Sequence, residues 1–430
     1  MKTNRKPNDL TIQEVEYFRM IEKVFMKRCR QFAYKEIKTG TIQPLHIYTA
    51  LGTLSPNRLR RMYSFLDWDG WSGERVVLKP DSSPSVIRFY AENLYDIQQT
   101  QKLCYVENHF EWSDTGENIS ERWQCGIENI GDLSVTSDIE SIFMAQDILE
   151  ELGFDNRQVF LSYPSIIRHI VQTLIFSKDQ QTQILDEIKK QRLDHVKNMM
   201  SGVDKGSVLL KLLEIKGNSV NYLKNVFQLL NGPEFKAITN DMERLLQVSE
   251  KLDQIQCAYT LDFSLIGNLD YYTGIQFQIF VDTSRKSNAE ILCAGGRYDH
   301  LTLEMFRLLN KQEPTDQDFI PAIGFALYAK NIINKLFARK EQQGVKPHIA
   351  IYISRLASES IKIAQLLSDI LDEMDFTSSM TFIPIEQENY NQYGAVLEVD
   401  HERFQSGYQF LHEQSLNKHI LNYVLGEDNG

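Results

Sequence analysis

The chain has 430 residues, which is long enough for two or three domains with sizeable cores. Hydrophobic residues make up 42% and charged residues 24%, an ordinary balance for a globular protein that excludes a disordered or fibrous chain. The formal net charge of −12 argues against tight nucleic-acid binding, because phosphate contacts require clustered basic side chains.

Signals for membranes, secretion and metals are weak throughout the sequence. No stretch approaches the roughly 18 consecutive apolar residues of a membrane span, and no apolar run follows the basic N-terminal residues. The five cysteines are scattered, odd in number and never spaced as Cys-x-x-Cys. We therefore expect a cytoplasmic protein without a disulfide framework, a metal site or a cofactor.

The first part of the chain predicts helices and strands of one core. Apolar residues at helical spacing indicate a helix over residues 11–33, and Pro84 suits the first turn of a helix over Ser83–Leu94. A third helix is expected over Asp138–Leu152. The strands expected here are Tyr34–Thr41, Glu74–Pro80, Leu103–Phe110 and Trp123–Ile130, the last two joined by a polar loop.

From Lys178 to Gln256 the composition shifts. Polar residues alternate with Leu and Ile at helical spacing and no strand signal appears, so this part predicts an all-helical insertion. Strands are expected again at Ala258–Ile266, Ile275–Val281 and Glu290–Ala294, followed by a helix over Ala322–Phe337.

The last part of the chain indicates a second domain. Residues 1–337 are expected to form the core, Ala338–Pro347 a linker, and residues 346–430 a small α/β domain. Its expected elements are a strand at His348–Ile353, a helix at Glu359–Met374, and strands at Thr381–Ile385, Ala395–Val399 and His419–Leu425. From Lys346 to Gly430 there are 5 basic and 13 acidic residues, so this part carries 5 − 13 = −8 charges.

Three segments carry the functional signal. They are residues 78–88 (Leu-Lys-Pro-Asp-Ser-Ser-Pro-Ser-Val-Ile-Arg), residues 269–274 (Leu-Asp-Tyr-Tyr-Thr-Gly) with 294–299 (Ala-Gly-Gly-Arg-Tyr-Asp), and residues 321–327 (Pro-Ala-Ile-Gly-Phe-Ala-Leu). In this order and spacing they resemble the histidyl-tRNA synthetase core over about the first 335 residues. The resemblance implies an α+β fold, with the class II aminoacyl-tRNA synthetase antiparallel sheet and flanking helices.

The resemblance also implies a pocket for histidine. An amino acid with an imidazole ring needs carboxylates for its ammonium group, polar groups for the ring, and aromatic walls. The positions that match the family's pocket are Asp81, Ser83, Gln124, Glu128, Tyr271 and Tyr272.

The phosphate-binding arginines of the family are replaced. Glu111 follows Phe110 where the family has an arginine for the α-phosphate, and Gly267 stands at a second arginine position. The third is Asn331, preceded by Lys330. Since fixed guanidinium groups stabilise the charge that develops on phosphate, we expect no catalytic residues for ligation. The motif 1 proline is also replaced, by Gly40.

A synthetase-like core with an amino-acid pocket and without ATP chemistry resembles the regulatory subunits of ATP phosphoribosyltransferase. The resemblance implies a non-catalytic, allosteric, histidine-sensing subunit in the first step of histidine biosynthesis. Its partner would be a short catalytic subunit, with L-histidine as effector and a homodimer within a hetero-oligomer. Two alternatives remain: a divergent histidine–tRNA ligase or amino-acid-activating paralogue, and a sensor or interaction protein unrelated to histidine synthesis.

Overall fold

The computed structural model describes most of the chain. The residues described are 9–49, 59–68, 73–95, 100–112, 119–214, 216–218, 220–266, 272–281, 290–309, 320–343, 348–354, 357–373, 377–385 and 395–399. Within these ranges, no helix has the length and apolar character needed to cross a membrane. The chain divides into two compact units, Met1–Leu336 and Phe337–Gly430. The strand expected at His419–Leu425 and the site positions Gly267 and Tyr271 lie outside the described residues.

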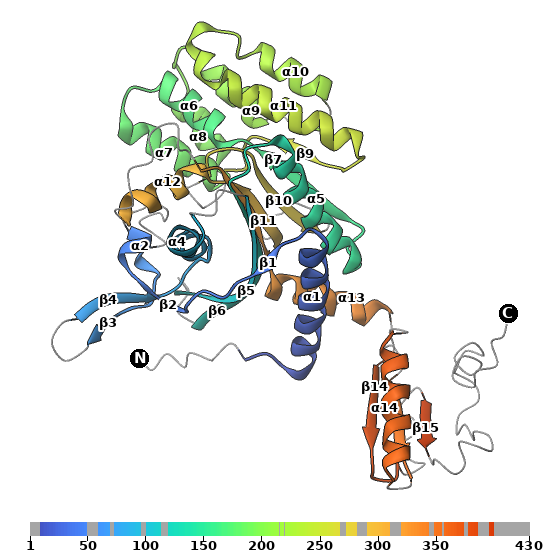
Figure 1. The fold of residues 1–430 in the computed structure, drawn as a ribbon. Helices are drawn as coiled ribbons and strands as arrows, with labels where there is room; N and C mark the ends of the chain where they lie inside the picture. Colours follow the sequence, from blue (N-terminus) through green and yellow to red (C-terminus); the bar gives the residue numbers. More distant parts are fainter. Residues whose placement is uncertain are drawn as a thin grey trace, which may run out of the picture. The chain divides into compact units, whose positions relative to one another are not determined.

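A nine-stranded sheet forms the centre of the first unit (Figure 1). In spatial order its strands are β1 (Lys35–Glu36), β5 (Gln101–Trp112), β6 (Ile119–Ile130), β12 (Ala322–Tyr328), β11 (Ile291–Arg297), β10 (Gln276–Val281), β7 (Arg157–Ser162), β9 (Thr260–Asp262) and β8 (Lys216–Gly217). Six of its eight pairings are antiparallel, and the other two, β1–β5 and β7–β9, are parallel. The expected antiparallel sheet is therefore present, with one parallel pair toward each edge.

Helices cover both faces of this sheet. On one face, α1 (Ile12–Gln31) contacts β6, and α5 (Val135–Glu151) contacts β7, β11 and β12. On the other face, α4 (Ser83–Asn93) and α12 (Asp299–Leu308) share a core cluster with Leu103 and Tyr105 of β5 (Figure 1). The expected helices at 11–33, 83–94 and 138–152 are thus confirmed to within a few residues.

Local chemistry explains where α1 begins. The side chain of Thr11 accepts a hydrogen bond from the backbone N–H of Glu14 at 3.3 Å, and the Glu14 carboxylate accepts one from the N–H of Thr11 at 2.8 Å. This reciprocal capping box satisfies two N–H groups that have no partner inside the helix. Phe18, Ile21 and Phe25 then follow at helical spacing and are buried.

The helix expected over Ala322–Phe337 is partly wrong. Residues 322–328 form β12, and α13 (Ala329–Gln343) begins only after Tyr328. β12 lies between β6 and β11 in the middle of the sheet, so both of its faces are covered and it shows no alternation of apolar and polar residues. A short apolar run of this kind cannot be distinguished from a buried helix by periodicity. The linker expected from Ala338 is wrong for its first residues, since α13 continues to Gln343.

The insertion is helical, as expected. Its helices gather at the β7–β9 end of the sheet (Figure 1) and are α7 (Lys178–Lys189), α8 (Leu193–Met199), α9 (Gly206–Glu214), α10 (Val220–Gln228), the 3₁₀ helix Pro233–Ile238 and α11 (Thr239–Gln254). One correction is the two-residue strand β8 inside it, which pairs with β9. β7 and α6 (Pro164–Leu174), which connect α5 to the insertion, were not predicted.

A second, smaller sheet lies between β1 and β5 in the chain. Its order is β2 (Ile42–Pro44), β4 (Gly73–Leu78) and β3 (Ser64–Trp68), all antiparallel, and the short helix α2 (His46–Thr49) follows β2. β4 confirms the strand expected at Glu74–Pro80. It leads directly into the segment that carries Asp81 and Ser83 and then into α4.

The described part of the second unit contains a three-stranded sheet and one helix packed on it. β13 (His348–Ile353) pairs in parallel with β14 (Thr377–Thr381) on one side and β15 (Ala395–Val399) on the other. α14 (Ser358–Glu373) packs its apolar side on these strands, with Ile351, Ala364 and Leu371 in the core. The expected strand at Thr381–Ile385 is misplaced, because the strand ends at Thr381.

Candidate functional site

Glu128 lies near the C-terminal end of β6, on the sheet face that α4 and α12 cover. Its neighbours in the sheet are Leu103 of β5 and Gly324 of β12. Because paired residues in an antiparallel sheet share a face, this register places Glu128 beside the core cluster rather than beside α5. The residue is 1% exposed, so its carboxyl group is almost completely removed from water.

Two hydroxyl groups donate hydrogen bonds to the Glu128 carboxylate. Ser83 Oγ, in the first turn of α4, lies 2.6 Å from Oε1, and the phenol of Tyr298 donates to Oε2. Burial raises the pKa of Glu128 to about 8; the two hydroxyls oppose this rise, and the charge of nearby Asp81 adds to it. A buried carboxyl group of this kind is a strong acceptor for a ligand ammonium group, which would favour its ionised form.

Two glycines leave the space that this arrangement needs. A Cβ on Gly324 would lie 2.0 Å from Oε2 of Glu128, and a Cβ on Gly296 would lie 2.8 Å from the ring of Tyr272. Any larger residue at either position would therefore displace a side chain of the site. Gly296 belongs to β11 and not to a turn, so its role here is close packing.

Four of the sequence-predicted residues are brought together. Asp81, Ser83 and Tyr272 surround Glu128, and all four are buried. Burial raises the pKa of Tyr272 well above its usual value, and the charges of neighbouring groups, Asp81 and Glu128 among them, raise it further. Gln124 is half-buried on the same face of β6, four residues and about 13 Å along the strand from Glu128.

Two tyrosines of this site were not predicted. Tyr298 bonds Glu128 directly, and Tyr105, on β5, is 1% exposed and close to both Glu128 and Asp81. Tyr298 stands inside the Gly-Gly-Arg-Tyr-Asp motif, which was the signal available for it. Tyr105 has only the alternation of β5 as a signal, since odd-numbered residues of that strand are buried.

The described positions at which the sequence comparison expects lost phosphate arginines have other contacts. Glu111 shares the sheet face of Glu128 at the far end of β5, is 8% exposed, and lies 3.8 Å from Arg122 of β6. Lys330 forms an ion pair with Glu14 of α1, which lowers the pKa of Glu14 to about 2. The amide of Asn331 donates to the carbonyl of residue 291 at 2.7 Å. Both residues of α13 therefore fasten that helix to its neighbours.

The arginine of the Gly-Gly-Arg-Tyr-Asp motif is structural. Arg297 is 2% exposed, and its Nε donates to Asp138 of α5 at 2.9 Å. Arg244 of α11 donates to the other oxygen of the same carboxylate, also at 2.9 Å. Arg297 also donates to Asp299, whose carboxylate accepts the N–H of residue 322 at 2.8 Å. The motif thus joins β11, α5, β12 and the helical insertion around buried charges.

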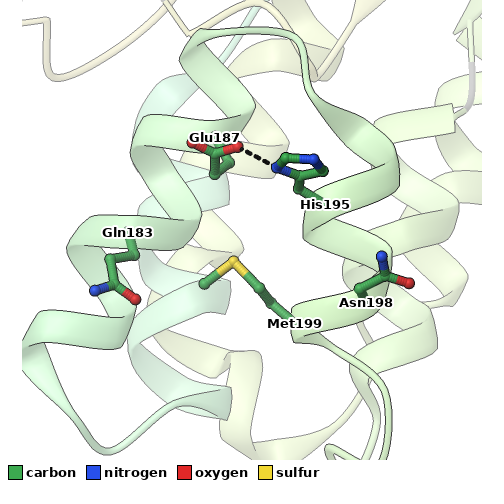
Figure 2. Close-up of a pocket in the computed structure, with 5 residues that line it drawn as sticks. All are labelled: Gln183, Glu187, His195, Asn198 and Met199. Carbon is green, nitrogen blue, oxygen red and sulfur yellow. Dashed lines mark hydrogen bonds and ion pairs between the residues drawn. The ribbon is translucent and has the colours of Figure 1, made fainter.

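A pocket of about 370 Å³ lies elsewhere, between α7 and α8 of the insertion. Figure 2 shows its lining side chains, Gln183, Glu187, His195, Asn198 and Met199. His195 Nδ1 lies 2.9 Å from a Glu187 oxygen, and Lys190 and Arg192 also pair with that carboxylate. The Glu187 carboxylate is already balanced by these cations, so the pocket offers little for recognising a charged ligand.

Comparison with known proteins gives a consistent set of relatives. The family model described as "Histidyl-tRNA synthetase" matches residues 7–332. A Dehalococcoides mccartyi protein named "ATP phosphoribosyltransferase regulatory subunit" is 32% identical over 390 residues, covering 89% of this chain and 88% of its own length. A "Histidine--tRNA ligase" of Methanocaldococcus jannaschii is 28% identical over 329 residues, covering 75% and 72%.

Solved structures show the same fold at low identity. A Bacillus halodurans chain described as "ATP phosphoribosyltransferase regulatory subunit/histidyl-tRNA synthetase" superposes with a TM-score of 0.71 at 17% identity, covering 93% of this chain and 98% of its own. Histidyl-tRNA synthetase from Nostoc gives 0.68 at 13% identity, covering 94% and 92%.

Proposed function

This chain belongs to the histidyl-tRNA synthetase family, and from that premise we propose that it is the regulatory subunit of an ATP phosphoribosyltransferase. Relatives that bear this name align with nearly the whole chain at 32% identity. The short-form catalytic subunit of that enzyme is the partner, within a hetero-oligomer that contains a homodimer of this chain. The proposed pathway role is the first step of histidine biosynthesis.

The proposal rests on the contrast between two acids on the same face of the sheet, Glu128 and Glu111. Glu128 keeps a buried carboxyl group with hydroxyl donors, as a pocket for an amino acid needs. Glu111 is an acid at the position that the resemblance matches to the family's α-phosphate arginine. Losing one fixed donor of this kind typically costs about 10²–10³ in rate. Two like charges 4 Å apart repel by about 4 kcal/mol at an effective dielectric constant of 20, so an acid opposes ATP more than a neutral residue would.

L-Histidine is the proposed effector. Asp81 and Glu128 would meet its ammonium group, and Ser83, Gln124, Tyr271 and Tyr272 complete the pocket. An effector acts only if it binds one state of the assembly better than another, and such coupling is commonly about 1–3 kcal/mol, or 5–150-fold. Histidine bound to this chain would then inhibit the catalytic partner without entering the partner's active site.

The test is reconstitution of the complete chain with a short-form catalytic subunit. We expect co-purification, formation of phosphoribosyl-ATP only when both chains are present, and inhibition by L-histidine. The Glu128→Ala complex should form product but resist histidine. A catalytic subunit that is fully active alone and unaffected by this chain would contradict the proposal.

ATP–pyrophosphate exchange separates the proposal from its enzymatic rival. We expect no histidine-dependent exchange, because Glu111, Gly267 and Asn331 replace the phosphate arginines. Exchange at a rate typical of aminoacyl-tRNA ligases, measured beside a histidine–tRNA ligase as positive control, would make this chain a divergent ligase instead.

A further inference from the structure

A second group of buried polar side chains adjoins the site and is distinct from the contacts of Glu128. Its centre is Glu107 of β5, whose side chain is 1% exposed. Lys79, equally buried, lies 2.7 Å from Glu107 Oε2. Thr39 donates to the same carboxylate through its backbone N–H at 2.6 Å and through its hydroxyl at 2.9 Å. Removing these charges from water is costly unless each is paired, and here each is paired.

The third partner of Glu107 is Ser82, which stands between the site residues Asp81 and Ser83. Ser82 is completely buried, and its Oγ donates to Glu107 Oε2 at 2.5 Å. Because a serine hydroxyl has one hydrogen, His109, 2.7 Å away, must donate to the same Oγ through Nε2. The single hydrogen of the hydroxyl is therefore committed to Glu107.

The position of Ser82 in the chain makes this contact unusual. It is the N-cap residue of α4, where a serine normally accepts a hydrogen bond from the helix and stabilises it by about 1 kcal/mol. Its side chain forms no such bond. The hydroxyl that could cap α4 donates to Glu107 instead. Glu107 therefore contacts the segment at two points, at Lys79 through the ion pair and at Ser82 through the hydroxyl.

We propose that Glu107 is a positioning residue of the amino-acid pocket, which holds residues 79–83 so that Asp81 and Ser83 face Glu128 before the ligand binds. This inference rests on the proposed function, since the pocket it serves is the one assigned to L-histidine. Preorganisation of this kind raises affinity because the ligand does not have to order the segment itself.

Substitution of Glu107 is a poor test. Glu107→Ala would leave the Lys79 ammonium buried without its carboxylate, and loss of one partner of a buried pair can unfold a protein. Ser82→Ala is sharper, because it removes one hydroxyl and keeps the ion pair. It removes no helix cap either, since Ser82 does not cap α4. The matched control is Ser141→Ala in α5, which removes another completely buried hydroxyl, one that donates to the carbonyl of residue 137.

The measurement is L-histidine binding to the full chain by calorimetry, with thermal melting of the same samples. We expect Ser82→Ala to weaken binding about tenfold, the effect of one hydrogen bond to a charged group. Ser141→Ala should lower the melting temperature comparably and leave the affinity unchanged, because a protein that remains folded at the assay temperature keeps its Kd. Equal affinity of the wild type and Ser82→Ala would overturn the inference while leaving the proposed function standing.

Backbone hydrogen exchange separates the two proposals if the wild type does not bind L-histidine at all. That result would remove the effector from the proposed function. Amide exchange would still test whether Glu107 orders the segment. The backbone amides of residues 81–86 should exchange faster in Ser82→Ala than in the wild type or in Ser141→Ala. Unchanged exchange in Ser82→Ala would overturn the positioning role of Glu107 independently of any ligand.

Discussion

The carboxyl group of Glu128 couples the stability of the protein to pH. Burial raises its pKa to about 8 in the folded chain, from a reference value of 4.5 for an exposed glutamate. The folded state therefore holds this proton more tightly than the unfolded state. The stabilisation is complete below the unfolded value and is lost as pH rises through the window from about 4.5 to about 8.

We therefore expect the free energy of unfolding of the ligand-free protein to fall across this window relative to a Glu128→Gln variant, which cannot ionise. The upper limit of the slope is about 1.4 kcal/mol per pH unit for one group. Urea denaturation of both proteins from pH 5 to 8 measures the difference. If the unfolding free energies of the two proteins vary with pH in parallel, Glu128 is ionised in the folded protein throughout the range.

The same residue should dominate affinity for the amino acid. Glu128→Ala removes the buried carboxyl group that we propose meets the ligand ammonium, and it should weaken L-histidine binding by about 2–5 kcal/mol. Calorimetry measures the loss, and Glu304→Ala, which removes an exposed acid of α12, serves as control. If Glu128→Ala binds as tightly as the wild type, the ammonium group is recognised elsewhere.

At the scale of elements, buried charges join parts that are distant in sequence. Asp138 of α5 is completely buried and accepts hydrogen bonds from Arg297 of β11 and from Arg244 of α11. One carboxylate thus connects the central sheet to the helical insertion. Tyr298 follows Arg297 directly and bonds Glu128, so the same short segment also forms part of the site.

Arg297→Met should therefore be strongly destabilising. It leaves Asp138 with one cation and Asp299 without its arginine, and breaking a buried pair typically costs about 3–5 kcal/mol. The control is Arg307→Met, whose partner Glu304 is exposed, with an expected effect within about 1 kcal/mol. All 4 tryptophans precede residue 337, so fluorescence-detected urea denaturation reports on the first unit. Equal losses in the two variants would contradict the role of the buried charges.

At the scale of the whole molecule, charge argues against RNA as a partner. The chain carries −12 formal charges, and residues 346–430 carry −8 of them. We expect no binding of tRNA in a gel shift at about 150 mM salt, because few cations are available to release counterions from phosphate. A histidine–tRNA ligase provides the positive control, and micromolar or tighter binding by this chain would refute the expectation.

Much of the fold follows from local pattern. α1, α4, β4, β5 and β13 lie close to their expected positions because each has a complete signal of its own, such as the Thr11 capping box or Pro84 in a first turn. β12 was expected to be helical because a strand buried on both faces shows no alternation. Its neighbours β6 and β11, far away in the chain, decide its structure.

For the site, the sequence by itself determined the chemistry: acids and hydroxyls in motifs whose order indicates an amino-acid pocket, and an acid at Glu111 in place of an arginine. Only the tertiary structure decided which groups meet. Ser83 and Glu128 are 45 residues apart, and Tyr298 is 170 residues from Glu128. Local periodicity reports which face of an element a residue occupies, whereas the pairing of β5, β6, β11 and β12 brings those faces together. That pairing also buries Glu107 against Ser82, a contact that neither residue signals alone.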